Sequence, residues 1–173
     1  MLSRRFQERV SSARAVGVGA LRGYELRWHK ASKDDSGKCD VVQSSIAQDV
    51  VFGVLYELNS AEKPQLDAAE GLGHGYAEKQ VVVETETGLV TAWTYYATDI
   101  SFDLVPYTWY KALVVAGAKE HGLPPPYISK LEAVPAKTDT DAKRAARNFS
   151  MANAANHPSS GPTPACDLRG PLI

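Results

Sequence analysis

One carboxylate in the sequence stands where general acid–base chemistry would be favoured. Glu70 follows Leu66 by one helical turn, so a helix that buries Leu66 directs Glu70 into, or along the edge of, the same apolar face. Glu70 also precedes Gly71, and the unpaired carbonyls of a last helical turn disfavour a negative charge. Burial and this potential both favour the protonated form, which suits a base working near neutral pH. The alternative is a structural role, in which Glu70 caps its glycine loop or pairs with a lysine.

Tyrosines supply a second group of candidates. Alternation along the segment that begins at Leu89 places Trp93 and Tyr95 on one face of a strand, and Tyr110 falls on the apolar stripe of a later helix. Most buried tyrosines pack their ring and find one partner for their hydroxyl. Two inward hydroxyls near one carboxylate would instead form a small polar pocket in an apolar wall, which is typical of small-molecule sites.

Other catalytic chemistries lack a pattern. The four histidines show no HxH or HxxxH spacing, so we expect no metal site. Cys39 and Cys166 form no CxxC motif, and no serine lies in a GxSxG elbow, so covalent catalysis has no support. Two isolated cysteines suit a reducing cytoplasm, which is the location we expect.

Composition argues against two classes of partner. The chain has 173 residues with 19 basic and 20 acidic side chains, so it lacks the cationic excess that nucleic-acid binding requires. Its longest apolar runs, such as 50–55 and 113–118, are far shorter than the roughly 20 residues of a membrane span. No apolar segment follows the N-terminal arginines as it would in a signal peptide. The length suits one domain.

Helical and strand patterns occur throughout the chain, as in an α+β domain. Residues 2–9 are predicted to form a short helix that buries Leu2 and Phe6 and leaves its arginines in solvent. The clearest helical stripe runs over 106–121 and ends before Gly122. The other predicted elements are a curved strand pair over 15–28, strands over 39–42 and 50–58, a brief helix from Pro64 to Gly71, a hairpin over 79–84 and 89–96, and helices over 125–133 and 139–155.

Successive blocks of the sequence resemble the gamma-glutamylcyclotransferase family, also called AIG2-like. These blocks are VFGVLYEL at 51–58, LDAAEG at 66–71 followed by Gly75-Tyr76, and AKEHGLP at 118–124, with GYELRW at 23–28 and the loop at 32–38 as earlier matches. The resemblance implies a small mixed β-barrel with flanking helices over residues 1–135. Residues 136–173 are then expected to form a polar helix and a flexible tail.

The resemblance also implies roles for individual residues. In that family the glutamate of the LDxxEG block is the catalytic acid–base, which corresponds to Glu70. The tyrosine on the helix before the AKEHGLP block lies at the substrate, which corresponds to Tyr110. Tyr95 and Tyr76 are further expected substrate contacts, as is Met1, which corresponds to the residue after a Tyr-Gly-Ser-Asn loop.

That loop and the strand before it are absent from this sequence. In the family, the backbone amides of the loop hold the gamma-glutamyl group. We expect that the start is set too late, because losing a core strand would expose a sheet edge. The 173-residue form is then expected to be weak or inactive.

The implied function is conversion of gamma-glutamyl amino acids or amines to 5-oxoproline and a free amine, by a lyase or acyltransferase of glutathione metabolism. The substrate carries its own nucleophile, so no cofactor is expected. The partner is a small gamma-glutamyl substrate, and the protein is a monomer or homodimer. Two alternatives stay open: a gamma-glutamyl-amine cyclotransferase or deprotecting tailoring enzyme, and a non-catalytic protein that binds gamma-glutamyl ligands or another partner on the same fold.

Overall fold

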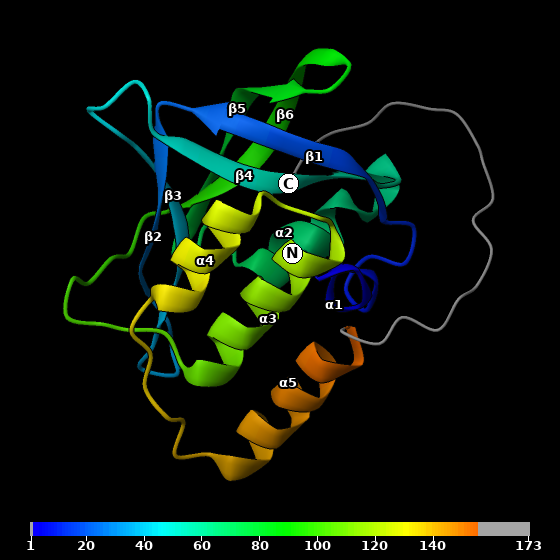
Figure 1. Cartoon of the computed structure of the whole chain (residues 1–173). Coiled ribbons are helices and arrows are strands. Elements are labelled where there is room, and N and C mark those ends of the chain that lie inside the picture. Colours follow the sequence, from blue (N-terminus) through cyan, green and yellow to red (C-terminus); the bar gives the residue numbers. More distant parts are fainter. Residues whose placement is uncertain (1, 156–173) are drawn as a thin grey trace.

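Six strands form two antiparallel sheets in the computed structural model, which describes residues 2–155. The four-stranded sheet has the order β4-β1-β5-β6, and β2 and β3 form a separate hairpin (Figure 1). Met1 and the predicted tail beyond residue 155 lie outside the described residues. The strands are β1 Arg14–Arg22, β2 Tyr24–Ala31, β3 Gly37–Gln43, β4 Val50–Glu57, β5 Tyr76–Thr85 and β6 Gly88–Ala97.

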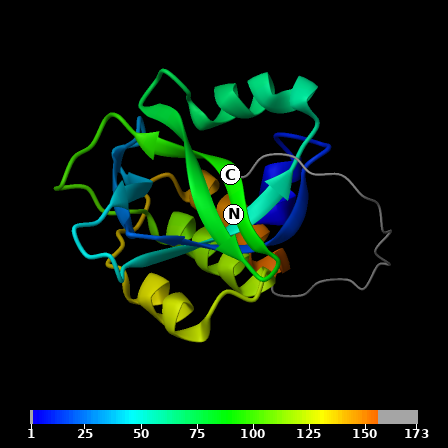
Figure 2. The same ribbon diagram turned by 90° about the horizontal axis from the view of Figure 1, so that it is seen from above.

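Helices cover the four-stranded sheet. In Figure 1, α3 and α4 lie together below β1 and β4, and α5 runs alongside α3. Figure 2 shows that α2 lies across the strands from α3 and α4. The helices are α1 Ser3–Gln7, α2 Lys63–Glu70, α3 Thr108–Glu120, α4 Pro125–Ala133 and α5 Ala142–Ala155.

Local sequence signals account for most of these elements. The hairpin of β5 and β6 keeps an unbroken register from Tyr76 opposite Ala97 to Thr85 opposite Gly88, and it extends beyond its predicted bounds. Its inward residues, such as Val81 and Val83, are buried. The predicted helices over residues 2–9, 64–70, 106–121, 125–133 and 139–155 are all present, with ends that differ by a few residues.

The pairing of the first strands differs from the prediction. Residues 15–28 contain two strands that meet at Gly23, which has a φ of +72°. These strands do not pair with each other: β1 pairs with β4, and β2 pairs with β3. Alternation shows that a strand exists, but it does not identify its partner when several apolar strands compete.

The α+β class with flanking helices is confirmed, while the barrel is not closed by backbone hydrogen bonds. The ladders among the described residues leave two separate antiparallel sheets. Between residues 2 and 155, no helix is both long and apolar enough to cross a bilayer.

Residues 136–155 pack on the rest of the fold. Ala152 of α5 is 2% exposed and belongs to an apolar cluster with Trp109 and Leu113 of α3. The Trp109 Nε1–H donates to Asp139 at 2.7 Å. The domain boundary at 135 stays a prediction, but α5 contributes to the packing of α3.

Candidate functional site

A cavity of about 520 Å³ lies between the sheets and helices α1 to α4. Its volume is within the range of small-molecule sites. Side chains predicted for the site come to it from four different elements: Glu70 from α2, Tyr76 from β5, Tyr95 from β6 and Tyr110 from α3 all line it. The fifth predicted residue, Met1, lies outside the described residues.

Helix α2 positions Glu70 as the spacing predicted. Leu66 is fully buried in the main core, and Glu70, one turn later, faces the cavity with 16% of its side chain exposed. The helix ends at Gly71, whose φ of +81° places it in the left-handed region. The Gly71 amide donates to the Asp67 carbonyl at 2.9 Å, which closes the last turn. The carboxylate is therefore held at a helix end that opens onto the cavity.

An arginine faces Glu70, and the sequence analysis did not foresee it. Arg9 Nη1 donates to Glu70 Oε1 at 2.5 Å. This charge-assisted hydrogen bond holds the carboxylate in one orientation. The prediction that the N-terminal arginines are solvated is correct for Arg4 but wrong for Arg5 and Arg9, which line the cavity. The partner of Arg9 lies 61 positions away, so local spacing gave no signal for the contact.

Two tyrosines converge on one backbone unit of β3. Tyr76 Oη donates to the Cys39 carbonyl at 2.8 Å, and the Cys39 amide donates to Tyr110 Oη at 3.2 Å. The Tyr110 hydroxyl accepts in this bond, so its own hydrogen is not used by it. Burial raises the pKa of both tyrosines, which stay protonated near neutral pH. The Tyr110 hydroxyl also interacts with the Cys39 thiol, so it can donate to a ligand in the cavity when its O–H turns away from that sulfur.

Tyr95 contacts a different carboxylate of α2. Its hydroxyl donates to Asp67 Oδ1 at 2.5 Å, and Lys63 also contacts that oxygen. Burial first, and then the Asp67 carboxylate, raise the pKa of Tyr95. Within residues 2–155, no hydrogen bond joins Glu70 to Tyr76, Tyr95 or Tyr110. The four side chains share a cavity without contacting one another through polar atoms.

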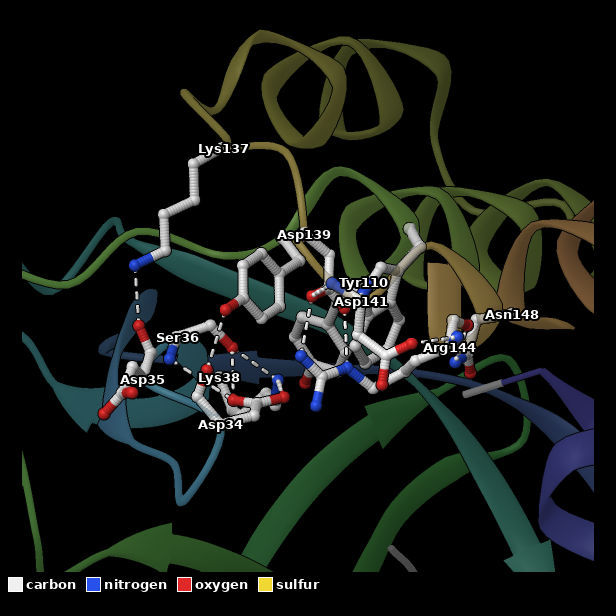
Figure 3. Close-up of polar contacts among 12 residues, drawn as sticks. Asp34, Asp35, Ser36, Lys38, Tyr110, Lys137, Asp139, Asp141, Arg144 and Asn148 are labelled. Carbon is white, nitrogen blue, oxygen red and sulfur yellow. Dashed lines mark hydrogen bonds and ion pairs between the residues drawn. The ribbon is translucent and has the colours of Figure 1, made fainter. Parts of the chain in front are cut away.

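Lys38 is a cavity residue that the sequence analysis missed. Its ammonium is 2.8 Å from Asp34 Oδ2 and lies over the rings of Tyr110 and Trp109, at 4.8 and 4.9 Å from their centroids (Figure 3). Burial is the main cause that lowers the pKa of Lys38. Its place in the loop-and-strand segment after Ser32 was visible, but neither its burial nor its aromatic neighbours could be read from spacing.

Asp40 and Cys39 also line the cavity, but their contacts indicate structural roles. Asp40 accepts from the Ala97 amide and lies 2.8 Å from His29 Nε2. Burial raises the pKa of the Cys39 thiol to about 12, so it is not a thiolate nucleophile at neutral pH. Among the described residues, no group of three His, Cys, Asp or Glu side chains could hold a metal ion. Glu70 is the cavity carboxylate best placed for proton transfer.

Comparisons with known proteins identify relatives of this chain. Residues 50–131 match the AIG2-like family. The gamma-glutamylcyclotransferase of Homo sapiens is 31% identical over 141 residues, which cover 78% of this chain and 73% of the relative. The gamma-glutamylcyclotransferase of Mus musculus is also 31% identical, over 147 residues with the same coverage of each chain.

Solved structures share the fold. A structure of a gamma-glutamyl cyclotransferase superposes with a TM-score of 0.77 and 28% identity, covering 86% of this chain and 92% of its own. YkqA from Bacillus subtilis superposes with a TM-score of 0.62 over 78% of this chain and 50% of its own. At 19% identity, the second match shows the fold alone.

Proposed function

The chain belongs to the gamma-glutamylcyclotransferase family, and on this premise we propose that it converts gamma-glutamyl amino acids or amines to 5-oxoproline and a free amine. The observation that carries the proposal is the position of Glu70. Its carboxylate lies at the end of α2 and lines a cavity of about 520 Å³. Arg9 Nη1 donates to Glu70 Oε1 at 2.5 Å and so fixes the orientation of the carboxylate. A carboxylate held in this way can take a proton from a bound ammonium and later return it.

The reaction needs one proton carrier and a folded substrate. The Glu70 carboxylate accepts a proton from the α-ammonium of the gamma-glutamyl group. The freed α-amine then attacks the γ-carbonyl carbon, and a C–N bond closes the five-membered lactam. Glu70 returns this proton to the departing nitrogen, whose bond to the γ-carbon breaks. Glu70 then carries the second proton from the new lactam nitrogen to the released amine, which leaves as an ammonium. Because the attack is intramolecular, the enclosed cavity contributes to the rate by holding the chain folded.

Polar groups around Glu70 would support these steps. The Arg9 guanidinium holds the carboxylate in one orientation through these proton transfers. The Tyr110 hydroxyl can donate to the oxygen on which negative charge develops. Glu70 is the catalytic residue in this scheme, and Tyr110 is the proposed substrate contact.

The setting of the reaction is also part of the proposal. Cys39 is a free, buried thiol, which suits the reducing cytoplasm. Cleavage of gamma-glutamyl bonds there would place the protein in the turnover of gamma-glutamyl peptides, including glutathione metabolism. The catalytic groups among the described residues come from one chain, so a monomer or a homodimer would serve.

The test is release of 5-oxoproline from a panel of gamma-glutamyl amino acids and amines. Both the 173-residue chain and a form extended upstream in the same reading frame are assayed. Glu70→Gln keeps the side-chain shape and removes the base, so we expect kcat/KM to fall at least roughly 100-fold. Glu84→Gln on β5, which pairs with Arg22 at the surface, is the matched control and should keep its activity.

Two outcomes would contradict the proposal. If neither form releases 5-oxoproline from any substrate, the chain is not a cyclotransferase. Calorimetric binding of 5-oxoproline without turnover would then indicate the non-catalytic alternative. If folded Glu70→Gln keeps its activity, another residue carries the proton.

A further inference from the structure

Arg5 lies at the cavity wall and forms no ion pair with any residue that the structure describes. Four basic side chains line the cavity, and two of them have carboxylate partners: Arg9 pairs with Glu70, and Lys38 pairs with Asp34. For Arg5, the one side-chain hydrogen bond among the described residues goes to a neutral amide, with Nη1 donating to Asn148 Oδ1 at 2.8 Å. A guanidinium has five N–H donors, so most of those of Arg5 remain for a ligand.

The surroundings of Arg5 favour an anion. Burial first, and then the positive charge of Arg9, lower the pKa of Arg5. Burial first, then Arg144 and then Arg5 lower the pKa of Lys38. Glu70 and Glu8 act in the opposite direction on the pKa of Arg5 without forming an ion pair with it, and a half-buried positive charge that lacks an ion pair is costly. The planar guanidinium matches a carboxylate through two parallel hydrogen bonds, so a ligand carboxylate would relieve this cost.

Helix α5 fixes the orientation of Arg5. Asn148 is 5% exposed, and its Nδ2 donates to the Arg144 carbonyl at 2.8 Å, so its Oδ1 is directed to Arg5. Figure 3 shows Arg144 held in turn by Asp139, through two bonds of 2.6 Å. The helix that supplies Asn148 is thus anchored one turn away, and the guanidinium has a defined position before any ligand binds.

We propose that Arg5, positioned by Asn148, binds the carboxylate of the departing amino acid, and that it thereby selects gamma-glutamyl amino acids over gamma-glutamyl amines. This inference rests on the proposed function. The substrate has a second carboxylate, the α-carboxylate of the gamma-glutamyl group, which is adjacent to the ammonium that Glu70 deprotonates. Because Arg9 pairs with Glu70, Arg9 is nearer than Arg5 to this α-carboxylate. Arg5 precedes Arg9 by four residues and forms no ion pair with Glu70, so among the described residues it is the cavity guanidinium that remains for the carboxylate of the departing group.

Lys30 is the rival cation. It lines the cavity and also lacks a carboxylate partner among the described residues, but its ammonium lies over the Tyr76 ring, 5.1 Å from the centroid. Lys30 Nζ lies beside Gly75, in the loop that follows α2 and Glu70. A lysine is also a point charge without the paired geometry of a guanidinium. The proposal therefore assigns leaving-group selectivity to Arg5.

The experiment compares two substrates that differ by one carboxylate, gamma-glutamylalanine and gamma-glutamylethylamine. It uses whichever of the two forms described above releases 5-oxoproline. Arg5→Met should lower kcat/KM for gamma-glutamylalanine by roughly 10- to 100-fold and leave that for gamma-glutamylethylamine nearly unchanged, since a hydrogen bond to a charged group has this size. Arg5→Lys should recover part of the loss. Arg4→Met, on the same helix but exposed and paired with Glu8, is the matched control.

Asn148→Ala tests the positioning role. It should reduce the ratio of kcat/KM for gamma-glutamylalanine to that for gamma-glutamylethylamine, as Arg5→Met does but by less. A purely structural defect would instead lower both kcat/KM values together. The assignment would be overturned if Arg5→Met lowered kcat/KM equally for both substrates. It would also be overturned if Lys30→Met, and not Arg5→Met, reduced the selectivity. Absence of 5-oxoproline from every substrate of the panel with the unsubstituted protein would instead refute the proposed function itself.

Discussion

Replacing Leu66 with alanine tests whether the core under the catalytic helix positions Glu70. Leu66 is fully buried, and it packs in the cluster that also holds Phe6, Val54 and Tyr95. The substitution removes three carbon atoms, worth about 2.4 kcal/mol at about 0.8 kcal/mol each, and the residual cavity adds to this loss. We expect the free energy of unfolding to fall by about 3 kcal/mol, within a range of about 2 to 5.

Urea and thermal unfolding measure this change. A loss of about 3 kcal/mol corresponds to a melting temperature roughly 6–12 °C lower for a chain of this size. Leu66→Met conserves volume and should cost less than about 1.5 kcal/mol. Val82→Ala on β5, where the side chain is 57% exposed, should change stability by no more than about 0.5 kcal/mol.

A small effect of Leu66→Ala would refute the reasoning. If the free energy of unfolding falls by less than about 1 kcal/mol, Leu66 does not anchor α2 in the core, and the helical spacing that directs Glu70 to the cavity is not the cause of its position. Release of 5-oxoproline, assayed well below the melting temperature, separates a displaced base from a merely less stable fold.

Two further predictions concern the tyrosines and α5. Tyr110→Phe should lower kcat/KM for 5-oxoproline release roughly 10-fold or more, because it removes a hydroxyl that can donate to the substrate. Tyr76→Phe should mainly reduce the free energy of unfolding, by about 1–3 kcal/mol, because the Cys39 carbonyl loses this hydrogen-bond donor. Kinetics and urea unfolding of both variants distinguish the roles, and equal kinetic losses would contradict them. The pKa of Asp139 is lowered from its usual 3.8, first by Arg144 and then by the Asp141 amide and Trp109. The stability that Asp139 contributes is therefore present above about pH 4 and is lost as the pH falls below that value. Unfolding curves between about pH 5 and pH 3 should show this loss, and Asp139→Asn should lack this part of the pH dependence.

The sequence alone determined the features that depend on neighbours within a helical turn or a short hairpin. Leu66, Glu70 and Gly71 lie within six residues, so helix period and glycine chemistry predicted a buried anchor, a carboxylate on the cavity side and a helix end. The order of blocks along the chain also identified the family, which the relatives confirm.

Tertiary structure decided the contacts between residues that lie far apart in the chain. Arg9 contacts Glu70 across 61 positions, Tyr110 contacts Cys39 across 71, and Asn148 contacts Arg5 across 143. Each depends on how strands pair and where helices pack, and side-chain spacing carries no record of either. For the same reason, the predicted pairing within residues 15–28 was wrong although both strands were present. Residue spacing within α2 directs the proposed base to the cavity, and contacts between distant segments bring the cations and tyrosines of the candidate site around it.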